Sequence, residues 1–175
     1  MTNTMPESPD KKTPPLAGWW VPGSGGLACP GFGLDRAAKG EGMAYEPDEQ
    51  LRAKLGDRIV WLTTVTPSGR PAPRPVWFVY DDGAFLVFSQ ATAAKVRHLR
   101  TNPHVTVHFH TDPGAEHVLV VIGTAEVADR PRPSELPAYL DKYEASFPAI
   151  GYDRDSFDAT FDTCIRITPE RAWGF

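Results

Sequence analysis

The stretch SQATAAKVRHLRTNP, residues 89–103, has the clearest potential for chemistry in this chain. A strand is expected to end at Ser89, and Gln90 begins a polar turn that leads into a short helix carrying Lys95. The first amides of a helix have no partner within the helix and carry the positive end of its dipole. A lysine beside them adds a full positive charge, so the segment predicts a binding site for phosphate or another anion.

Arg74 is a second candidate ligand for the same anion. It precedes the apolar half of a predicted strand, PVWFV (75–79), and closure of a barrel would bring its guanidinium towards Lys95. Arginine binds phosphate through two parallel hydrogen bonds, whereas lysine acts as a point charge. The alternative interpretation is that Lys95, Arg97 and Arg100 are solvated charges on a short surface helix.

Other reactive side chains give weaker patterns. His104, His108 and His110 share one face of a predicted strand, which is compatible with a metal or haem site and equally with a solvent-exposed face. We expect no metal, because no acidic residue accompanies them at a fixed spacing. Cys164 is expected to be a small core residue. No catalytic side chain is assigned, since no Ser-His-Asp or Cys-His arrangement has the local context of a hydrolase.

These residues must be positioned by a mainly antiparallel β fold with a few helices. Short β-branched or aromatic runs alternate with turn residues, among them Pro67-Ser68-Gly69 and Asp81-Asp82-Gly83, and this spacing is typical of hairpins. Hairpins favour an antiparallel barrel or sandwich over a parallel, doubly wound sheet. The predicted strands are 58–65, 70–80, 84–89, 105–110, 117–128, 163–168 and 171–175.

Helices are expected on both sides of the strand region. Before it, Glu46 is a plausible N-cap, Pro47 suits the first helical position and Gly56 suits the exit. Between residues 134 and 162 the apolar pattern becomes helical. Two aromatic stripes carry that pattern, one formed by Tyr139, Leu140, Tyr143 and Phe147 and the other begun by Phe157 and Phe161.

Composition limits the class of protein. With 175 residues, 41% of them hydrophobic, the chain can form one globular core. The net charge of −4 argues against a generally basic nucleic-acid surface. We expect no membrane partner and a cytoplasmic location, because there is neither a long apolar run nor a secretory signal. Residues 1–45, rich in Pro, Gly and Ser, are predicted to be a flexible tail, and 46–175 the folded domain. Docking of Trp19 and Trp20 on the domain or a partner is the alternative.

Three blocks stand in a characteristic order: RIVWLTTVTPSGRPAPRPVWFVYDDGAFLVFS, AAKVRHLRTNPHVTV and VVIGTAEV. With them, residues from about 46 onwards resemble the split β-barrel flavin and deazaflavin reductases related to pyridoxamine 5′-phosphate oxidase. The pattern Lys95, Leu99, Asn102, Pro103 is fairly specific in this context. The first block and the ending CIRITPERAWGF are most similar to the subgroup that uses the deazaflavin coenzyme F420.

The resemblance implies an antiparallel, Greek-key split barrel that forms a homodimer with two cofactor sites at the interface. It places the cofactor phosphate on Arg74 and Lys95, above a turn containing Ser89 and Gln90. Trp173 would reach the cofactor of the partner. The cofactor ring would lie along the backbone of Pro75, Val76, Trp77, Phe78 and Val79.

Two departures bear on the cofactor. Pyridoxamine phosphate oxidases have an arginine before the phosphate lysine and a glutamine before the VIG motif, where this chain has Ala94 and Val118. The resemblance therefore implies an F420-dependent oxidoreductase that passes a hydride to a small organic acceptor. The alternatives are an FMN-dependent oxidoreductase and a non-catalytic carrier of a flavin, deazaflavin or haem-type ligand.

Overall fold

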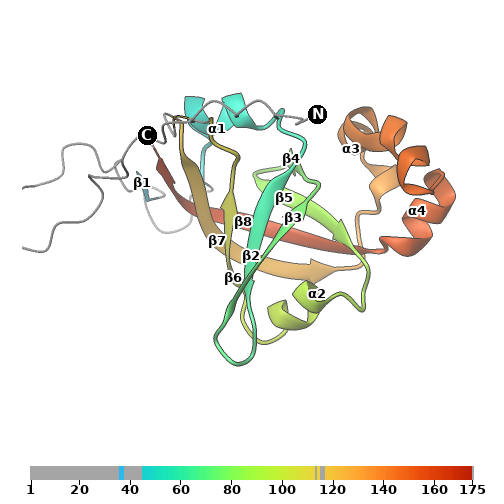
Figure 1. Ribbon diagram of the computed structural model, residues 1–175, viewed down its shortest axis with the longest axis horizontal. Coiled ribbons are helices and arrows are strands. Elements are labelled where there is room, and N and C mark those ends of the chain that lie inside the picture. The colour runs from blue at the N-terminus through green and yellow to red at the C-terminus, as the bar shows by residue number, and fades with distance from the viewer. Residues whose placement is uncertain (1–35, 38–44, 113, 115–116, 175) are drawn as a thin grey trace, which may run out of the picture. The chain divides into compact units, whose positions relative to one another are not determined.

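The computed structural model describes residues 36–37, 45–112, 114 and 117–174. Within these ranges the chain forms eight strands in one antiparallel sheet and several short helices (Figure 1). The strands are β1 (Arg36–Ala37), β2 (Val60–Val65), β3 (Pro71–Val76), β4 (Val79–Asp81), β5 (Ala84–Ser89), β6 (His104–His108), β7 (Leu119–Ala128) and β8 (Thr163–Gly174). The helices are α1 (Glu49–Lys54), α2 (Ala94–Leu99), α3 (Pro137–Tyr143) and α4 (Arg154–Thr160), with three 3₁₀ turns at Pro133–Glu135, Glu144–Ser146 and Pro148–Ile150.

The sheet curls into a barrel whose strands follow the order β3-β2-β6-β7-β8-β5-β4, with β1 paired to β8 outside this path. Every pairing is antiparallel. The hairpin turns have the predicted chemistry, since Gly69 and Gly83 adopt the positive φ angles of 79° and 73° that glycine tolerates best. The prediction of an antiparallel split β-barrel is confirmed.

The predicted strands are wrong at two places, and the ends of the runs 58–65, 105–110 and 117–128 differ by up to two residues from β2, β6 and β7. The run 70–80 forms two strands, because the chain stops pairing with β2 after Val76 and begins to pair with β5 at Val79. The runs 163–168 and 171–175 are one strand, β8, which continues through Pro169. A register shift between Ile122 and Gly123 accommodates that proline, whose missing N–H is tolerated at a bulge.

The cap of α1 also differs from the prediction. Asp48, not Glu46, is the N-cap, and its Oδ1 accepts the Leu51 N–H at 2.9 Å. The carboxylate satisfies an amide that has no partner within the helix. Gly56 follows the C-cap residue, as expected.

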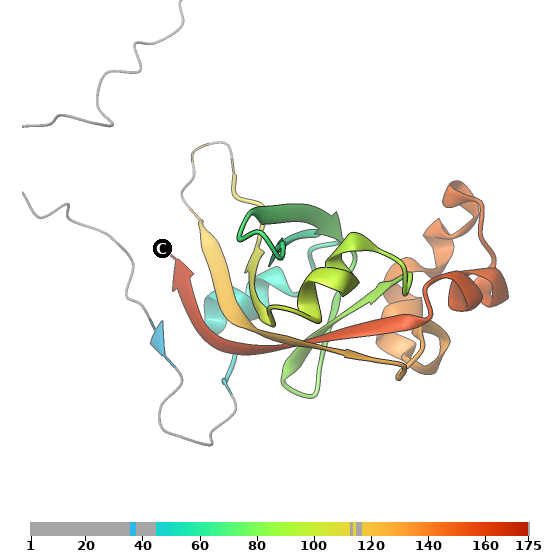
Figure 2. The ribbon, with the colours of Figure 1, turned by 90° about the horizontal axis from the view of Figure 1, so that it is seen from below.

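The core has two parts, one on each side of the strands. The barrel interior contains buried side chains from every long strand and is closed by Leu51 of α1 and by Val96 and Leu99 of α2. These two helices lie at opposite ends of the barrel, and the view from below shows α2 in front of the sheet (Figure 2). The second core lies where α3 and α4 cover the outer face of β4, β5 and β8.

The predicted tail lies almost entirely outside the described residues, including Trp19 and Trp20. Its described parts are β1, which pairs with Ala172 and Arg171 of β8, and Tyr45, which is buried in the barrel interior. The division into a tail and a domain at residue 45 therefore stays a prediction. None of the helices in the described ranges is long and apolar enough to cross a membrane.

Candidate functional site

Lys95 and Ser89 lie together, as the sequence predicts. Lys95 Nζ donates a hydrogen bond to Ser89 Oγ over 3.1 Å, and Ser89 is buried at the end of β5. Helix α2 is fixed beneath them, because Val96 and Leu99 are buried and His98 Nδ1 lies 2.9 Å from Thr64 Oγ1. The lysine is therefore held by the core rather than free on the surface.

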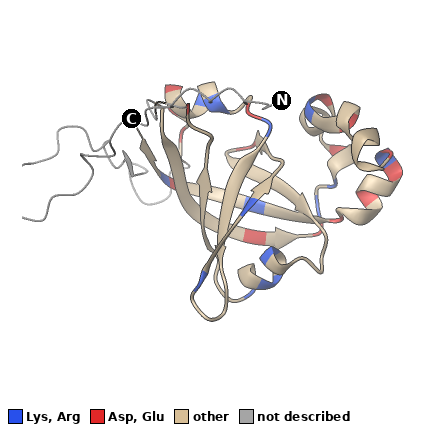
Figure 3. Ribbon diagram, viewed as in Figure 1, with Lys and Arg blue, Asp and Glu red and all other residues tan. Residues whose placement is uncertain are grey.

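Among the described residues, the ammonium group of Lys95 has no counterion. Burial, with a further contribution from the nearby charge of Arg74, lowers the pKa of Lys95. Within the described part of the chain, neither of these two cations makes an ion pair; Arg74 Nη1 donates a hydrogen bond to the carbonyl oxygen of Pro73 at 2.7 Å. Figure 3 shows basic residues and no acidic residue on α2. Two adjacent cations without a carboxylate form an environment suited to an anion.

A pocket of about 340 Å³ opens beside Lys95. Apart from the lysine, its lining is apolar and largely aromatic. Three of the predicted residues, Pro75, Val76 and Trp77, contribute to it together with Lys95. The other lining residues are Ile59, Phe88, Tyr139, Ile150, Phe157 and Phe161. A single cation on an aromatic cavity fits a ligand with an anionic group attached to a planar ring.

The wall provided by α3 and α4 is the part that sequence reasoning missed. Trp77 stacks on Tyr143 with 4.6 Å between ring centroids and 6° between planes, and Phe157 lies 6.1 Å from the same indole. The aromatic stripes at helical spacing predict buried helix faces, and Tyr139 and Phe157 are indeed buried. That spacing gives no indication that the same rings also border a pocket.

The side chains of Phe78 and Val79 are not part of the pocket lining. The Phe78 side chain is buried in the barrel interior, and that of Val79 is buried under the helices. The backbone N–H and C=O of Phe78 are already bonded to Tyr143 and Lys142. Of the predicted segment 75–79, the first three residues face the pocket.

Gln90 and Trp173 lie away from the pocket lining. Gln90 is exposed, and its carbonyl oxygen accepts the Ala93 N–H at 3.0 Å in the turn before α2. Trp173 lies on β8 opposite Val120, ten residues beyond Thr163, the partner of Ser89. At about 3.3 Å per residue this separation is roughly 33 Å along the strand. Trp173 is therefore not part of the site that contains Ser89 in the same chain.

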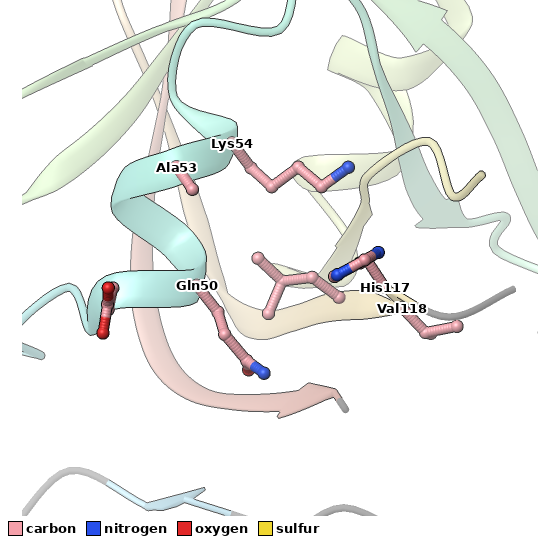
Figure 4. A pocket seen from close by; sticks show the side chains of 7 residues that line it. Gln50, Ala53, Lys54, His117 and Val118 are labelled. Carbon is pink, nitrogen blue, oxygen red and sulfur yellow. The ribbon is translucent and has the colours of Figure 1, made fainter.

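A second pocket, of about 250 Å³, lies between α1 and the start of β7. Figure 4 shows Gln50 and Lys54 on one side of it and His117 and Val118 on the other. Two of its polar side chains already have partners: Lys54 Nζ donates to the His110 carbonyl oxygen at 2.9 Å, and His117 Nδ1 lies 2.7 Å from Asp112 Oδ2. We favour the Lys95 pocket, because its cation has no carboxylate partner among the described residues.

The three strand histidines do not converge on one point. His104 and His110 are exposed, whereas His108 is half-buried, with Nε2 2.9 Å from Thr106 Oγ1. Burial lowers the pKa of His108. In the ranges that the structure describes, no group of three His, Cys, Asp or Glu side chains could hold a metal ion.

Comparison with known proteins places the fold in a family. The family described as pyridoxamine 5′-phosphate oxidase matches residues 47–174, which is most of the chain. The chain belongs to this family. A curated member, the pyridoxine/pyridoxamine 5′-phosphate oxidase of Streptomyces avermitilis, is 27% identical over 141 residues. That match covers 75% of this chain and 57% of the relative, so the chain spans little more than half the length of that oxidase.

Solved structures agree with this fold. An F420 reductase superposes with a TM-score of 0.58 at 22% identity, covering 73% of this chain and 98% of the reductase. HutZ, the haem storage protein of Vibrio cholerae, superposes with a TM-score of 0.50 at 20% identity, covering 70% of this chain and 89% of HutZ. Proteins of this fold thus include a reductase and a storage protein, and similarity at this level establishes the barrel alone.

Proposed function

We propose that this protein is an F420-dependent oxidoreductase that transfers a hydride between the deazaflavin and a small organic acceptor. The observation that supports this proposal best is the position of Lys95. Its ammonium group, bonded to Ser89 and close to Arg74, borders an aromatic pocket and has no carboxylate partner among the described residues. The membership in the pyridoxamine 5′-phosphate oxidase family and the similarity to an F420 reductase support the same class of reaction.

The residues present fit such a cofactor. Lys95, Ser89 and Arg74 would hold the phosphate through charge-assisted hydrogen bonds. Trp77 and the aromatic side chains of α3 and α4 would exclude water from the ring and orient it. The deazaflavin, when bound, supplies the hydride, and the protein contributes binding, orientation and a dry cavity. No side chain of this chain is required as a proton donor, since solvent can complete the reduction.

Charge distribution favours F420 over FMN. The phosphate of F420 is a diester followed by an acidic tail, and the exposed Arg97 and Arg100 extend the basic surface along α2 beyond Lys95. FMN ends in a phosphate dianion that calls for a tighter cluster of cations. Ala94, exposed at the start of α2, contributes no charge to such a cluster.

We also propose that the protein acts as a homodimer. Strand register aligns Pro75, Trp61, His108, Val120 and Trp173 in one row across the outer face of the sheet. Trp61 in this row is 40% exposed, and a second copy that covers this face would bury its large apolar surface. A second copy on this face would bring its Trp173 towards the cofactor of the first. Sedimentation of the wild type and of Trp61→Glu tests this, with a monomeric wild type as the contradicting result.

A non-catalytic carrier is the second candidate, because a haem storage protein shares the fold. Turnover separates the two classes. Purified protein is mixed with reduced F420 and a panel of conjugated acceptors, and oxidation of the cofactor is followed by absorbance. Multiple turnovers support the oxidoreductase, whereas tight binding without oxidation supports the carrier. Competition titrations then compare F420, FMN and haem by quenching of tryptophan fluorescence; a protein purified with stoichiometric FMN would contradict the F420 assignment.

A further inference from the structure

The chain turns a corner of the barrel between β3 and β4. Val76 is the last residue paired with β2, opposite Val60, and Val79 is the first paired with β5, opposite Leu86. Trp77 and Phe78 belong to neither ladder. Figure 1 shows this corner close to the end of α3 that faces the barrel.

Helix α3 replaces the missing strand at this corner. The Phe78 N–H donates to the Tyr143 hydroxyl at 3.0 Å, and the Phe78 carbonyl oxygen accepts from that hydroxyl at 2.8 Å and from Lys142 Nζ at 3.1 Å. Phe78 is completely buried, so these backbone groups have no access to water. An unbonded backbone group in such a place would be strongly unfavourable, which makes the two side chains structural substitutes for a sheet partner.

The same two side chains are themselves fixed by the segment between α1 and β2. Lys142 Nζ donates to the Leu55 carbonyl oxygen at 3.0 Å, and the Tyr143 hydroxyl lies 2.8 Å from the carbonyl oxygen of Arg58. Arg58 Nη1 in turn donates to the Lys142 carbonyl oxygen at 2.8 Å. The Lys142 ammonium also lies 3.8 Å from the centre of the Phe78 ring.

The position of Trp77 follows from these contacts. Its indole stacks on the ring of Tyr143, whose hydroxyl holds the next residue of the backbone. The Tyr143 side chain therefore contacts the Trp77 indole through its ring and holds the adjacent backbone at Phe78 through its hydroxyl. Because Trp77 lines the pocket beside Lys95, a displacement of Phe78 would move the pocket wall.

We propose that Lys142 and Tyr143 are positioning residues, which place the Trp77 indole in the ligand pocket by holding the backbone of Phe78. Neither is among the residues that line the pocket, so each acts through Trp77. The effect on ligand affinity rests on the proposed function, whereas the effect on Trp77 does not.

The test uses two conservative variants of the full chain. Tyr143→Phe keeps the stacked ring and removes the hydroxyl, and Lys142→Met keeps the length of the stem and removes the ammonium. Asp141→Asn, an exposed change on the same helix, is the matched control, and Lys142→Arg should restore part of the donor function. Circular dichroism verifies that each variant folds.

Two measurements are made without ligand. Amide hydrogen exchange at Phe78 is expected to accelerate by about fivefold to tenfold in Tyr143→Phe, which removes the acceptor of this N–H, and by less in Lys142→Met, which removes a donor to the carbonyl oxygen. The indole N–H resonance of Trp77, assigned with Trp77→Phe, is expected to shift in both variants and to stay in place in Asp141→Asn. An unshifted Trp77 resonance in Tyr143→Phe and Lys142→Met would overturn the proposal.

The third measurement is the dissociation constant for F420. We expect this constant to rise about fivefold in both variants, because a displaced Trp77 no longer matches the ligand. A shifted Trp77 with unchanged affinity would overturn the role of this corner in binding. If the wild type itself binds no F420, the proposed function fails, while the Trp77 resonance still decides whether the two residues position the indole.

Discussion

The Trp77 indole lies parallel to the Tyr143 ring, with 4.6 Å between their centroids. Sixty-six positions separate the two residues along the chain, and the contact joins the barrel to the helical layer. The pocket beside Lys95 therefore has one wall from the sheet and one from α3 and α4. Changes in either part are expected to alter ligand binding.

Lys95→Ala is expected to weaken binding of F420 by roughly 1.5–3 kcal/mol, the scale of one charge-assisted contact. The fold should persist, since Val96 and Leu99 anchor α2 independently. Fluorescence titration measures the loss, with Arg52→Ala on the exposed side of α1 as a control of equal charge change. Unchanged affinity in Lys95→Ala would remove this residue from the site.

Binding of F420 is expected to weaken as salt rises. Arg74, Arg97 and Arg100 are exposed, and charges in water are screened over about 10 Å at 0.1 M ionic strength. FMN should bind more weakly than F420 at every salt concentration. Titrations of both ligands from low to high sodium chloride measure the two slopes. An FMN advantage in direct competition would contradict this prediction.

The stability of the fold should depend on pH through Lys142. Burial, aided by Arg58 and opposed by Asp57, lowers the pKa of this amine from 10.5 to about 8. Between these values the unfolded chain binds one more proton than the folded chain, so the free energy of unfolding rises with pH. The slope should stay below about 1.4 kcal/mol per pH unit, because the amine is half-exposed and screened.

Urea denaturation from pH 7 to 10.5 measures this slope in the wild type and in Lys142→Met. The variant lacks the titrating amine, so the difference in unfolding free energy between the two proteins should change with pH in this window. A constant difference would show that the pKa of Lys142 is the same in the folded and the unfolded chain.

Gly123→Ala is expected to destabilise the barrel. A Cβ at this position would collide with the carbonyl oxygen of Thr168 on the neighbouring strand, at the bulge between β7 and β8. Overpacking of this kind costs about 1–3 kcal/mol, and here the obstacle is backbone rather than a flexible side chain. Gly56→Ala is the control, since a Cβ there meets nothing within 4 Å. Equal melting temperatures for the two variants would contradict the prediction.

Deletion of residues 1–44 is expected to change the melting temperature by only a few degrees, because this segment has no core-forming pattern. A parallel deletion of residues 1–35 retains β1 and its pairing with β8. A large loss of stability in both proteins would show that the aromatic residues upstream, such as Trp19 and Trp20, dock on a folded part.

Sequence predicts the local features of this fold well. Turn residues such as Gly83 identify the hairpins, and strand β5 matches its predicted range. The corner at Trp77 and Phe78 is invisible in the sequence, because side chains continue to alternate through it: Val76 and Phe78 enter the barrel interior while Trp77 faces the helices. Only the hydrogen-bond partner of the backbone changes there, and that partner is remote in sequence.

The site is predictable to a similar extent. Lys95 and Ser89 are six residues apart, so a strand, a turn and a helix suffice to bring them together. The aromatic wall depends on how α3 and α4 pack across β4 and β5, which periodicity alone does not specify. Strand β8 carries Trp173 far from the Ser89 end of its own sheet, and its predicted reach to the cofactor of a partner stays a prediction.

The central place of β8 has a consequence for biosynthesis. Residues 163–174 pair with both β7 and β5, so among the described strands β8 is the one that joins these two sides of the sheet. While a ribosome is still making it, β5 and β7 expose unpaired edges that can pair with other nascent chains. The barrel therefore closes only after residues 163–174 have been synthesised, and until then the unpaired edges favour aggregation.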